Sequence, residues 1–341
     1  MNRKHFLSFL ITAGTAAFNS EAFAGSKNEA GRHSSRIPPY LMEGDTIGIT
    51  SPASFISMAE IQPAVAQLQH WGFKVEIGKT IGSRDFTRGG TDGERAADLQ
   101  QMLDRQEIKA ILCARGGYGL VRIIDQLNFR HFKKHPKWLI GFSDITLLHT
   151  HINSKYKIAS IHSKMCNSFP NVWEEALPIQ IETILSIRQV LTGQAVRYTA
   201  AYNEHNREGR AEGILVGGNL SLIETATGSS SELHTANKIL FIEDTNEPLY
   251  SLDRMLWNLK RSGKLDKLKG LIIGGFKLKP EEPGEEFGIS LHEIVLEKVK
   301  EYDYPVCFDF PVGHQINNFA LKCGAAHILN IDQNGSTLTS I

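Results

Sequence analysis

Ser143 lies where an apolar run gives way to a helical pattern, a position that suits a nucleophile. Residues 138–141 are apolar and predict a strand, and residues 145–152 have helical spacing. A serine on a sharp turn between a strand and a helix exposes its hydroxyl, and N–H groups at the helix start can stabilise a developing oxyanion. The segment Gly141-Phe142-Ser143-Asp144 departs from the Gly-x-Ser-x-Gly form. The alternative is that Ser143 or Asp144 only caps the helix.

A glycine-rich turn, Arg115-Gly116-Gly117-Tyr118-Gly119, follows another apolar run at residues 110–114. Parallel strands present their carboxyl ends at one edge of a sheet, so this turn should open beside Ser143. Glycines allow close approach of the backbone, and an N–H of Gly116 or Gly117 would complete an oxyanion hole with that of Asp144. A phosphate-binding loop is the alternative, but the lysine and the spacing of such loops are missing.

Two groups suited to proton transfer come late in the chain. Glu243 follows the apolar run 239–242 and could orient a histidine, as the third member of a catalytic triad does. A capped loop or a cation site is the other interpretation of this acidic segment, although no partner ligands are evident. His314 follows Gly313 in a turn, where histidines are usually surface residues.

The remaining histidines and the cysteines indicate no metal site. His149 and His151 are two residues apart on a predicted helix and therefore face different directions. His162 and His327 lie in or beside apolar segments, which favours packed side chains. The cysteine spacings match no zinc ligand set, and the sequence leaves a disulfide open. We expect neither metal nor cofactor. The cysteines are Cys113, Cys166, Cys307 and Cys323.

These residues need a scaffold, and the chain predicts an α/β fold. Strands at 45–50, 73–77, 110–114 and 138–141 alternate with helical patterns, one of which predicts a helix from Leu120 onward, and this alternation is typical of a parallel sheet with helices on both faces. After a break near residues 165–212, short strands and two helices predict a smaller mixed α+β C-terminal domain. The predicted organisation is a signal peptide at 1–24, a flexible leader at 25–36, domains at 37–185 and 211–341, and a linker at 186–210.

The N-terminal segment and the net charge indicate the compartment and the partners of the protein. Arg3 and Lys4 precede an apolar run from Phe6 to Phe18, and Ala22-Phe23-Ala24 supplies the small residues of a cleavage site. This predicts export, to the periplasm, by either the general or the twin-arginine route. No later run is long enough to span a membrane, so no stable insertion is expected after cleavage. Lys+Arg and Asp+Glu both number 37 in 341 residues, which disfavours nucleic-acid binding.

Seven segments, taken in their order, resemble the L,D-carboxypeptidase family of bacterial serine peptidases, which includes muramoyl-tetrapeptide carboxypeptidases and microcin C self-immunity peptidases. Each segment is weak alone, but the ordered set covers about residues 37–335. The segments are Gly44-Asp45-Thr46-Ile47 with Ser51-Pro52, Gly90-Thr91-Asp92 with Arg95 and Asp98-Leu99, residues 115–119, residues 141–146, residues 213–220, Ile242-Glu243-Asp244 with residues 253–256, and residues 308–314 with 324–329.

The resemblance implies a Ser-Glu-His triad of Ser143, Glu243 and His314, in a cleft between the two domains. It also implies a homodimer and an acyl-enzyme mechanism without metal, acting on the L,D bond of murein tetrapeptide to release D-alanine. The terminal carboxylate of such a substrate suggests an arginine clamp, for which Arg115 is our hypothesis.

One segment departs from the family pattern, which often has a Gly-Pro pair where this chain has His162-Ser163-Lys164-Met165. The stretch borders the predicted cleft, so substrate preference can differ here. Two other functions remain open: an immunity-type peptidase that cleaves an aminoacyl or peptidyl nucleotide, and a murein-peptide binding protein without turnover. The signal peptide disfavours the first, because such nucleotides act in the cytoplasm, and an intact triad disfavours the second.

Overall fold

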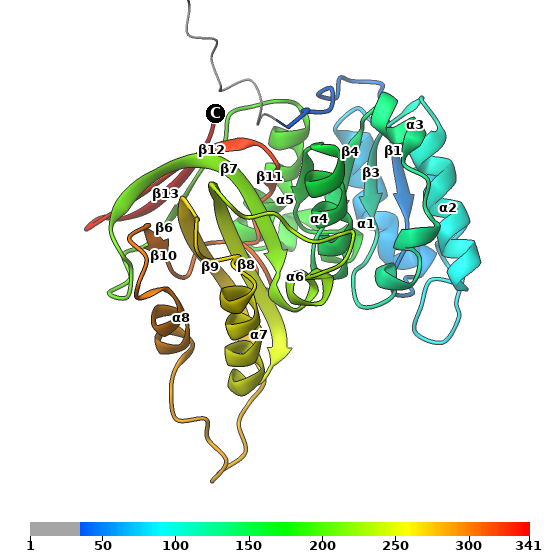
Figure 1. Ribbon diagram of the computed structural model, residues 1–341. Coiled ribbons are helices and arrows are strands. Elements are labelled where there is room, and N and C mark those ends of the chain that lie inside the picture. Colours follow the sequence, from blue (N-terminus) through cyan, green and yellow to red (C-terminus); the bar gives the residue numbers. More distant parts are fainter. Residues whose placement is uncertain (1–34) are drawn as a thin grey trace, which may run out of the picture. The chain divides into compact units, whose positions relative to one another are not determined.

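The computed structural model describes residues 35–341, which belong to one compact unit (Figure 1). The predicted signal peptide and all but the last two residues of the predicted leader lie outside the described residues, so these two expectations stay predictions. None of the helices in residues 35–341 combines the length and the apolarity needed to cross a bilayer.

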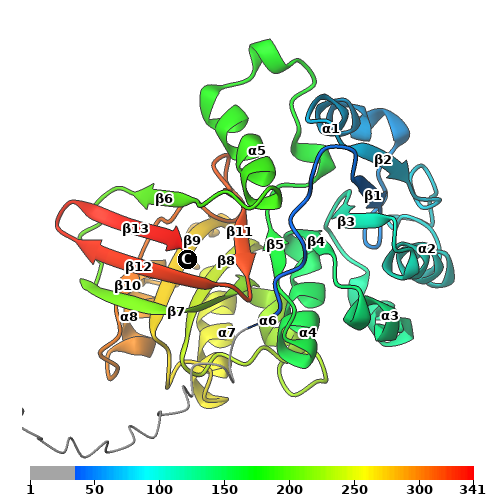
Figure 2. The same ribbon diagram turned by 90° about the horizontal axis from the view of Figure 1, so that it is seen from above.

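The first sheet is parallel except at one edge. Its strand order is β11-β5-β4-β3-β1-β2, and only β11 runs antiparallel to its neighbour. Figure 2 shows this strand, from the C-terminal end of the chain, beside β5. The strands are β1 (Thr46–Thr50), β2 (Lys74–Ile77), β3 (Ile108–Cys113), β4 (Trp138–Gly141), β5 (Ser160–His162) and β11 (Leu321–Cys323).

Helices cover both faces of this sheet, as predicted. In β3, Ala110 and Leu112 pack into one core with α1 and α5, whereas Ile111 and Cys113 pack into another with α2, α3 and α4. This division follows from the two-residue period of a strand, which sends alternate side chains to opposite faces. The helices are α1 (Met58–His70), α2 (Asp92–Asp104), α3 (Arg130–Lys134), α4 (Thr146–Tyr156) and α5 (Pro178–Leu191).

The helix expected from Leu120 onward is wrong. The chain instead forms two short 3-10 turns, Leu120–Arg122 and Ile124–Gln126, before α3. The first turn has no side-chain cap, and the N–H of Leu120 donates to Asp144 Oδ2 at 2.8 Å. A tertiary contact therefore determines how this segment starts.

The second sheet is mixed, with the order β10-β9-β8-β7-β12-β13-β6, which confirms the predicted architecture of the C-terminal half. Helices α7 and α8 pack against each other on one face (Figure 1). The strands are β6 (Arg197–Ala200), β7 (Gly209–Asn219), β8 (Lys238–Glu247), β9 (Gly270–Leu278), β10 (Val306–Cys307), β12 (Ala326–Asp332) and β13 (Gly335–Ser340), and the helices are α6 (Leu220–Ala226), α7 (Leu249–Arg261) and α8 (Leu291–Val299).

The two sheets share a core. In β8, Leu240 and Ile242 face α7 and α8, whereas Ile239 and Phe241 join the same cluster as α1 and α5 of the first sheet. Residues 186–210, expected as a linker, contain the end of α5, which is buried in this cluster, and strand β6. The domain boundaries stay a prediction.

Candidate active site

Ser143 lies on a strained turn between β4 and α4. Phe142 is extended, with φ −150°, and Ser143 then adopts φ +61° as it opens the 3-10 turn Ser143–Ile145 that leads into α4. A left-handed backbone costs an L-residue about 1–2 kcal/mol, so it persists only where the surroundings impose it. This is the geometry of a nucleophile elbow, in which a sharp turn exposes the serine hydroxyl.

The glycine-rich turn approaches Ser143 through Gly116. A Cβ at position 116 would lie 2.9 Å from Ser143 Cβ and 3.2 Å from Ser143 Oγ, so a side chain there would displace the serine. Gly117 lies instead against Ser54, whose Oγ would be 2.1 Å from a Cβ at position 117. The backbone of Gly116 is therefore the part of the turn in contact with the serine side chain.

Asp144 joins the elbow to the same turn. Its buried carboxylate accepts the Leu120 N–H at 2.8 Å, and burial raises its pKa to about 6. Its own backbone N–H belongs to the first turn of the helical segment, where such groups have no acceptor within the helix. That N–H and those of Gly116 and Gly117 are the candidate oxyanion donors.

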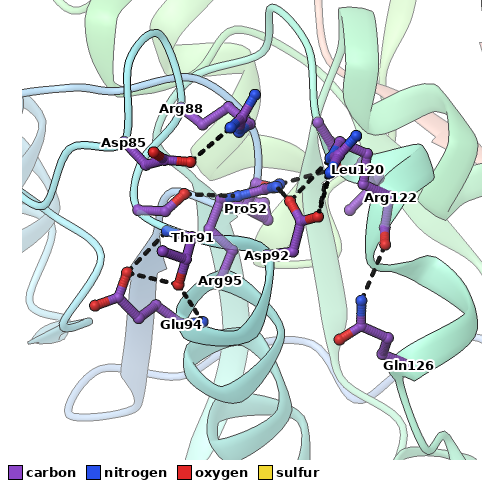
Figure 3. A network of polar contacts seen from close by, with 12 residues as sticks. Pro52, Asp85, Arg88, Thr91, Asp92, Glu94, Arg95, Leu120, Arg122 and Gln126 are labelled. Carbon is purple, nitrogen blue, oxygen red and sulfur yellow. Dashed lines mark hydrogen bonds and ion pairs between the residues drawn. The ribbon is translucent and has the colours of Figure 1, made fainter.

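A buried arginine, Arg95, donates a hydrogen bond to the glycine-rich turn, and Figure 3 shows the polar network around it. Arg95 is fully buried, and its Nη1 donates to Pro52 O at 2.6 Å and to Gly119 O at 2.8 Å. Its Nη2 contacts Asp92, whose carboxylate also accepts three hydrogen bonds from the exposed Arg122. The turn is thus tied to the start of α2.

Glu243 and His314 lie within hydrogen-bond distance of each other. Glu243 is fully buried, and its Oε2 lies 2.5 Å from His314 Nδ1. The pairing of β8 with β9 is irregular between Ile242 and Asp244, and such a bulge redirects a side chain. Gly313 allows the approach, because its φ is +104° and a Cβ there would lie 2.4 Å from Glu243 Cβ. With Nδ1 engaged, Nε2 is the ring nitrogen left to accept a proton.

The structure brings this pair to the serine segment. The ring of His314 lies against that of Phe142, with centroids 4.9 Å apart, and Phe142 directly precedes Ser143. Three residues separated by up to 171 positions therefore converge at one place. Serine, histidine and a buried carboxylate are the groups of a nucleophile, its base and the residue that orients the base.

A cavity of about 580 Å³ opens beside His314. It is lined from both halves of the chain, by Phe142, Lys164 and Phe169 from the first half and by Thr245, Lys277 and His314 from the second, among others. Sequence reasoning missed Lys164 and Lys277 as site residues. The departure from the family pattern at residues 162–165 was the available signal for Lys164.

Arg115 does not line this cavity. Its Nη1 donates to Phe55 O at 3.2 Å and lies 3.9 Å from Glu60 Oε1. The structure therefore places the guanidinium against the start of α1, and the Arg115 clamp stays a prediction that the geometry does not favour.

The four histidines considered from the sequence as ligands or packed residues are buried, and so are the four cysteines. His149 Nε2 contacts Gly141 O at 2.9 Å and His151 Nδ1 contacts Ser231 Oγ at 2.8 Å, so the two rings face different partners, and burial lowers the pKa of each to about 4. His162 and His327 are buried. Within residues 35–341, no three metal-ligating side chains cluster, and the four cysteines are free and buried.

Comparison with known proteins identifies the family. The LD-carboxypeptidase N-terminal domain matches residues 47–163, and the LD-carboxypeptidase C-terminal domain matches residues 212–329. A probable murein peptide carboxypeptidase of Bacillus subtilis is 34% identical over 86% of this chain and 91% of its own length. The murein tetrapeptide carboxypeptidase of Pseudomonas aeruginosa is 29% identical over 83% of this chain and 92% of its own.

The solved structures agree with this assignment. The microcin C7 self-immunity protein MccF, solved with aspartyl sulfamoyl adenosine, superposes with a TM-score of 0.78 at 25% identity, and the match covers 90% of this chain and 98% of that one. Since both family domains match in order and a relative above 30% identity spans most of the chain, the protein belongs to the LD-carboxypeptidase family of peptide hydrolases.

Proposed function

We propose that this protein is a serine L,D-carboxypeptidase that releases the terminal D-alanine of murein tetrapeptide. The observation that carries the proposal is the buried Glu243 on His314 Nδ1, beside a serine held at φ +61°. The similarity to murein peptide carboxypeptidases supports the substrate class. Peptide-bond cleavage is the activity of the family, and the serine mechanism and the L,D specificity are the finer parts of the proposal.

The proposed mechanism uses the residues of the site in turn. His314 Nε2 takes the proton of Ser143 as its oxygen attacks the carbonyl carbon, and the buried Glu243 stabilises the imidazolium that forms. The N–H groups of Asp144 and Gly116 or Gly117 bind the oxyanion, each contributing about 3 kcal/mol. The imidazolium then gives its proton to the amine of D-alanine, which leaves an acyl-enzyme that water hydrolyses.

The test is release of D-alanine from murein tetrapeptide by the mature chain, followed by mass spectrometry. We expect Ser143→Ala to lower the rate by at least about 10³-fold, because the acyl-enzyme can no longer form. Ser262→Ala, at an exposed serine after α7, is the matched control and should retain the wild-type rate. D-alanine release that persists in Ser143→Ala would refute the serine mechanism.

The same assay separates the other candidate functions. Cleavage of an aminoacyl nucleotide in preference to the tetrapeptide would favour the immunity-type activity, to which the likeness to MccF draws attention. Tetrapeptide binding without turnover in the wild type would favour the binding protein. Export to the periplasm and a homodimer belong to the proposal as well, and they are tested by fractionation of cells and by the mass of the protein in solution.

A further inference from the structure

The cavity beside His314 is positively charged. The ionisable side chains in its lining are Lys164, Lys277 and His314, and the lining contains no aspartate or glutamate. Lys277 is exposed on β9, whereas Lys164 is partly buried. A cavity with this lining favours a ligand that carries a carboxylate.

Lys164 is held between the two segments that carry the serine and the histidine. Its Nζ donates to Gln315 O at 2.6 Å, directly after His314, and lies 5.6 Å from the ring centroid of Phe142, directly before Ser143. The contact with Gln315 uses one of the three N–H groups of the ammonium. The ammonium is thus fixed in place while it retains donors for a ligand.

The carboxylate that acts on the charge of Lys164 is already paired with another residue. Burial lowers its pKa, and the carboxylate that opposes this effect is Glu243, whose Oε2 is already on His314. An anion in the cavity would offset this desolvation directly, since a partly buried ammonium gains most from a partner at hydrogen-bond distance.

The chemistry of carboxypeptidase cleavage indicates which anion would bind beside Lys164. The amine of the leaving residue must take its proton from His314, and the carboxyl carbon of the same residue lies only two bonds away, about 2.5 Å from the nitrogen. A cation beside His314 is therefore placed to meet that carboxylate. Arg115, with its guanidinium against Phe55 O and Glu60, is outside the cavity lining.

We propose that Lys164 is the specificity residue that binds the terminal carboxylate of the leaving amino acid and so restricts cleavage to the last residue of the peptide. The inference rests on the proposed function and assigns to Lys164 the role that the sequence suggested for Arg115. Its contact forms with bound substrate as well as in the transition state, so it should act mainly on KM.

The experiment compares two substrates, murein tetrapeptide with a free terminal carboxyl and the same peptide ending in D-alaninamide. Lys164→Met, which keeps the length of the side chain without its charge, should lower kcat/KM for the free acid by about 10- to 100-fold, the size of a charge-assisted hydrogen bond. The rise should be in KM. Cleavage of the amide should stay within about threefold of wild type, which also shows that the variant is folded.

Two further variants complete the design. Lys74→Met removes an exposed charge from β2, outside the cavity lining, and should leave the preference for acid over amide within about threefold of wild type. Arg115→Ala should leave that preference unchanged. If the wild type cleaves the amide too slowly to measure, competitive inhibition by D-alanine and by D-alaninamide gives the same ratio.

The outcomes are distinct. Equal losses for acid and amide in Lys164→Met would show a packing role and overturn the inference, as would an unchanged preference. A loss of the preference for acid over amide in Arg115→Ala would show that Arg115, and not Lys164, binds the terminal carboxylate. These results are independent of Ser143→Ala, because D-alanine release in that variant would refute the serine mechanism whatever Lys164 does.

Discussion

Two residues of the candidate site are held in energetically unfavourable states. Ser143 adopts a left-handed backbone that is unfavourable for any residue except glycine, and Glu243 is a fully buried carboxylate whose Oε1 has no partner among the described residues. Costs of this kind persist where the surrounding structure imposes them, and they gather at sites of chemistry. Both fall on residues that the sequence selected for the triad.

Asp144 gives a prediction at the residue scale. Burial raises its pKa from 3.8 to about 6, so the folded state binds a proton more tightly than the unfolded state. The stabilisation that this provides is complete below pH 4 and is lost as the pH rises through about 6. Asp144→Asn keeps an oxygen for the Leu120 N–H but does not titrate. Relative to wild type, its free energy of unfolding should therefore increase by about 3 kcal/mol between pH 4 and pH 7.

Urea unfolding at several pH values measures this difference. Burial also raises the pKa of Asp244 to about 6, and that contribution cancels because both proteins contain it. A difference between the two proteins that does not change with pH would contradict the shift at Asp144.

At the scale of elements, the glycine-rich turn depends on α2 through Arg95. Loss of this side chain would leave buried carbonyl groups of Pro52 and Gly119 without their donor. We expect Arg95→Met to lower the free energy of unfolding by about 3 kcal/mol, since each buried unpaired group costs about 1–3 kcal/mol. It should also lower kcat/KM, because Gly116 would no longer be held against Ser143.

Arg122→Met is the matched control, since Arg122 binds the same Asp92 carboxylate but from the surface (Figure 3). Exposed ion pairs contribute little, so this variant should resemble wild type in thermal melting and in activity. Equal effects of the two variants would show that the ion pair with Asp92, and not the carbonyl contacts, holds the turn.

For the whole molecule, β11 and the shared core join the two halves. Leu321 lies on β11, which comes from the C-terminal end of the chain and closes the edge of the first sheet beside β5. It packs in the same cluster as Ile47 of β1 and Phe241 of β8. One face of each sheet therefore packs into a core to which both halves contribute, whereas the opposite faces are covered in separate clusters.

This arrangement predicts one cooperative thermal transition for residues 35–341. Leu321→Ala should lower the free energy of unfolding by about 2–5 kcal/mol and move the whole transition to lower temperature, because the cavity lies in a core common to both sheets. Leu278→Ala, at the exposed end of β9, should change it little. Two separate transitions in calorimetry would show that the halves unfold independently.

The amino-acid sequence by itself determined the architecture and the candidates. Two-residue and helical periods predicted the strands and helices of the first half, because these periods report burial on one face, and they failed at Leu120, where a distant carboxylate decides the local structure. The triad of Ser143, Glu243 and His314 came from the resemblance of the ordered motifs to a known family, because no single motif distinguishes a catalytic residue from a helix cap or a loop residue.

Only the tertiary structure decided which long side chains reach the site. Arg115 and Lys164 are both cations near candidate catalytic segments, but the first is drawn to Phe55 O and Glu60 whereas the second is held by Gln315 O beside His314. Local sequence cannot distinguish them, because the direction of a flexible side chain depends on acceptors that other parts of the chain supply. The antiparallel edge strand β11 is likewise decided by the tertiary structure. It pairs with β5 across about 160 residues, and such a distant pairing leaves no local sequence pattern.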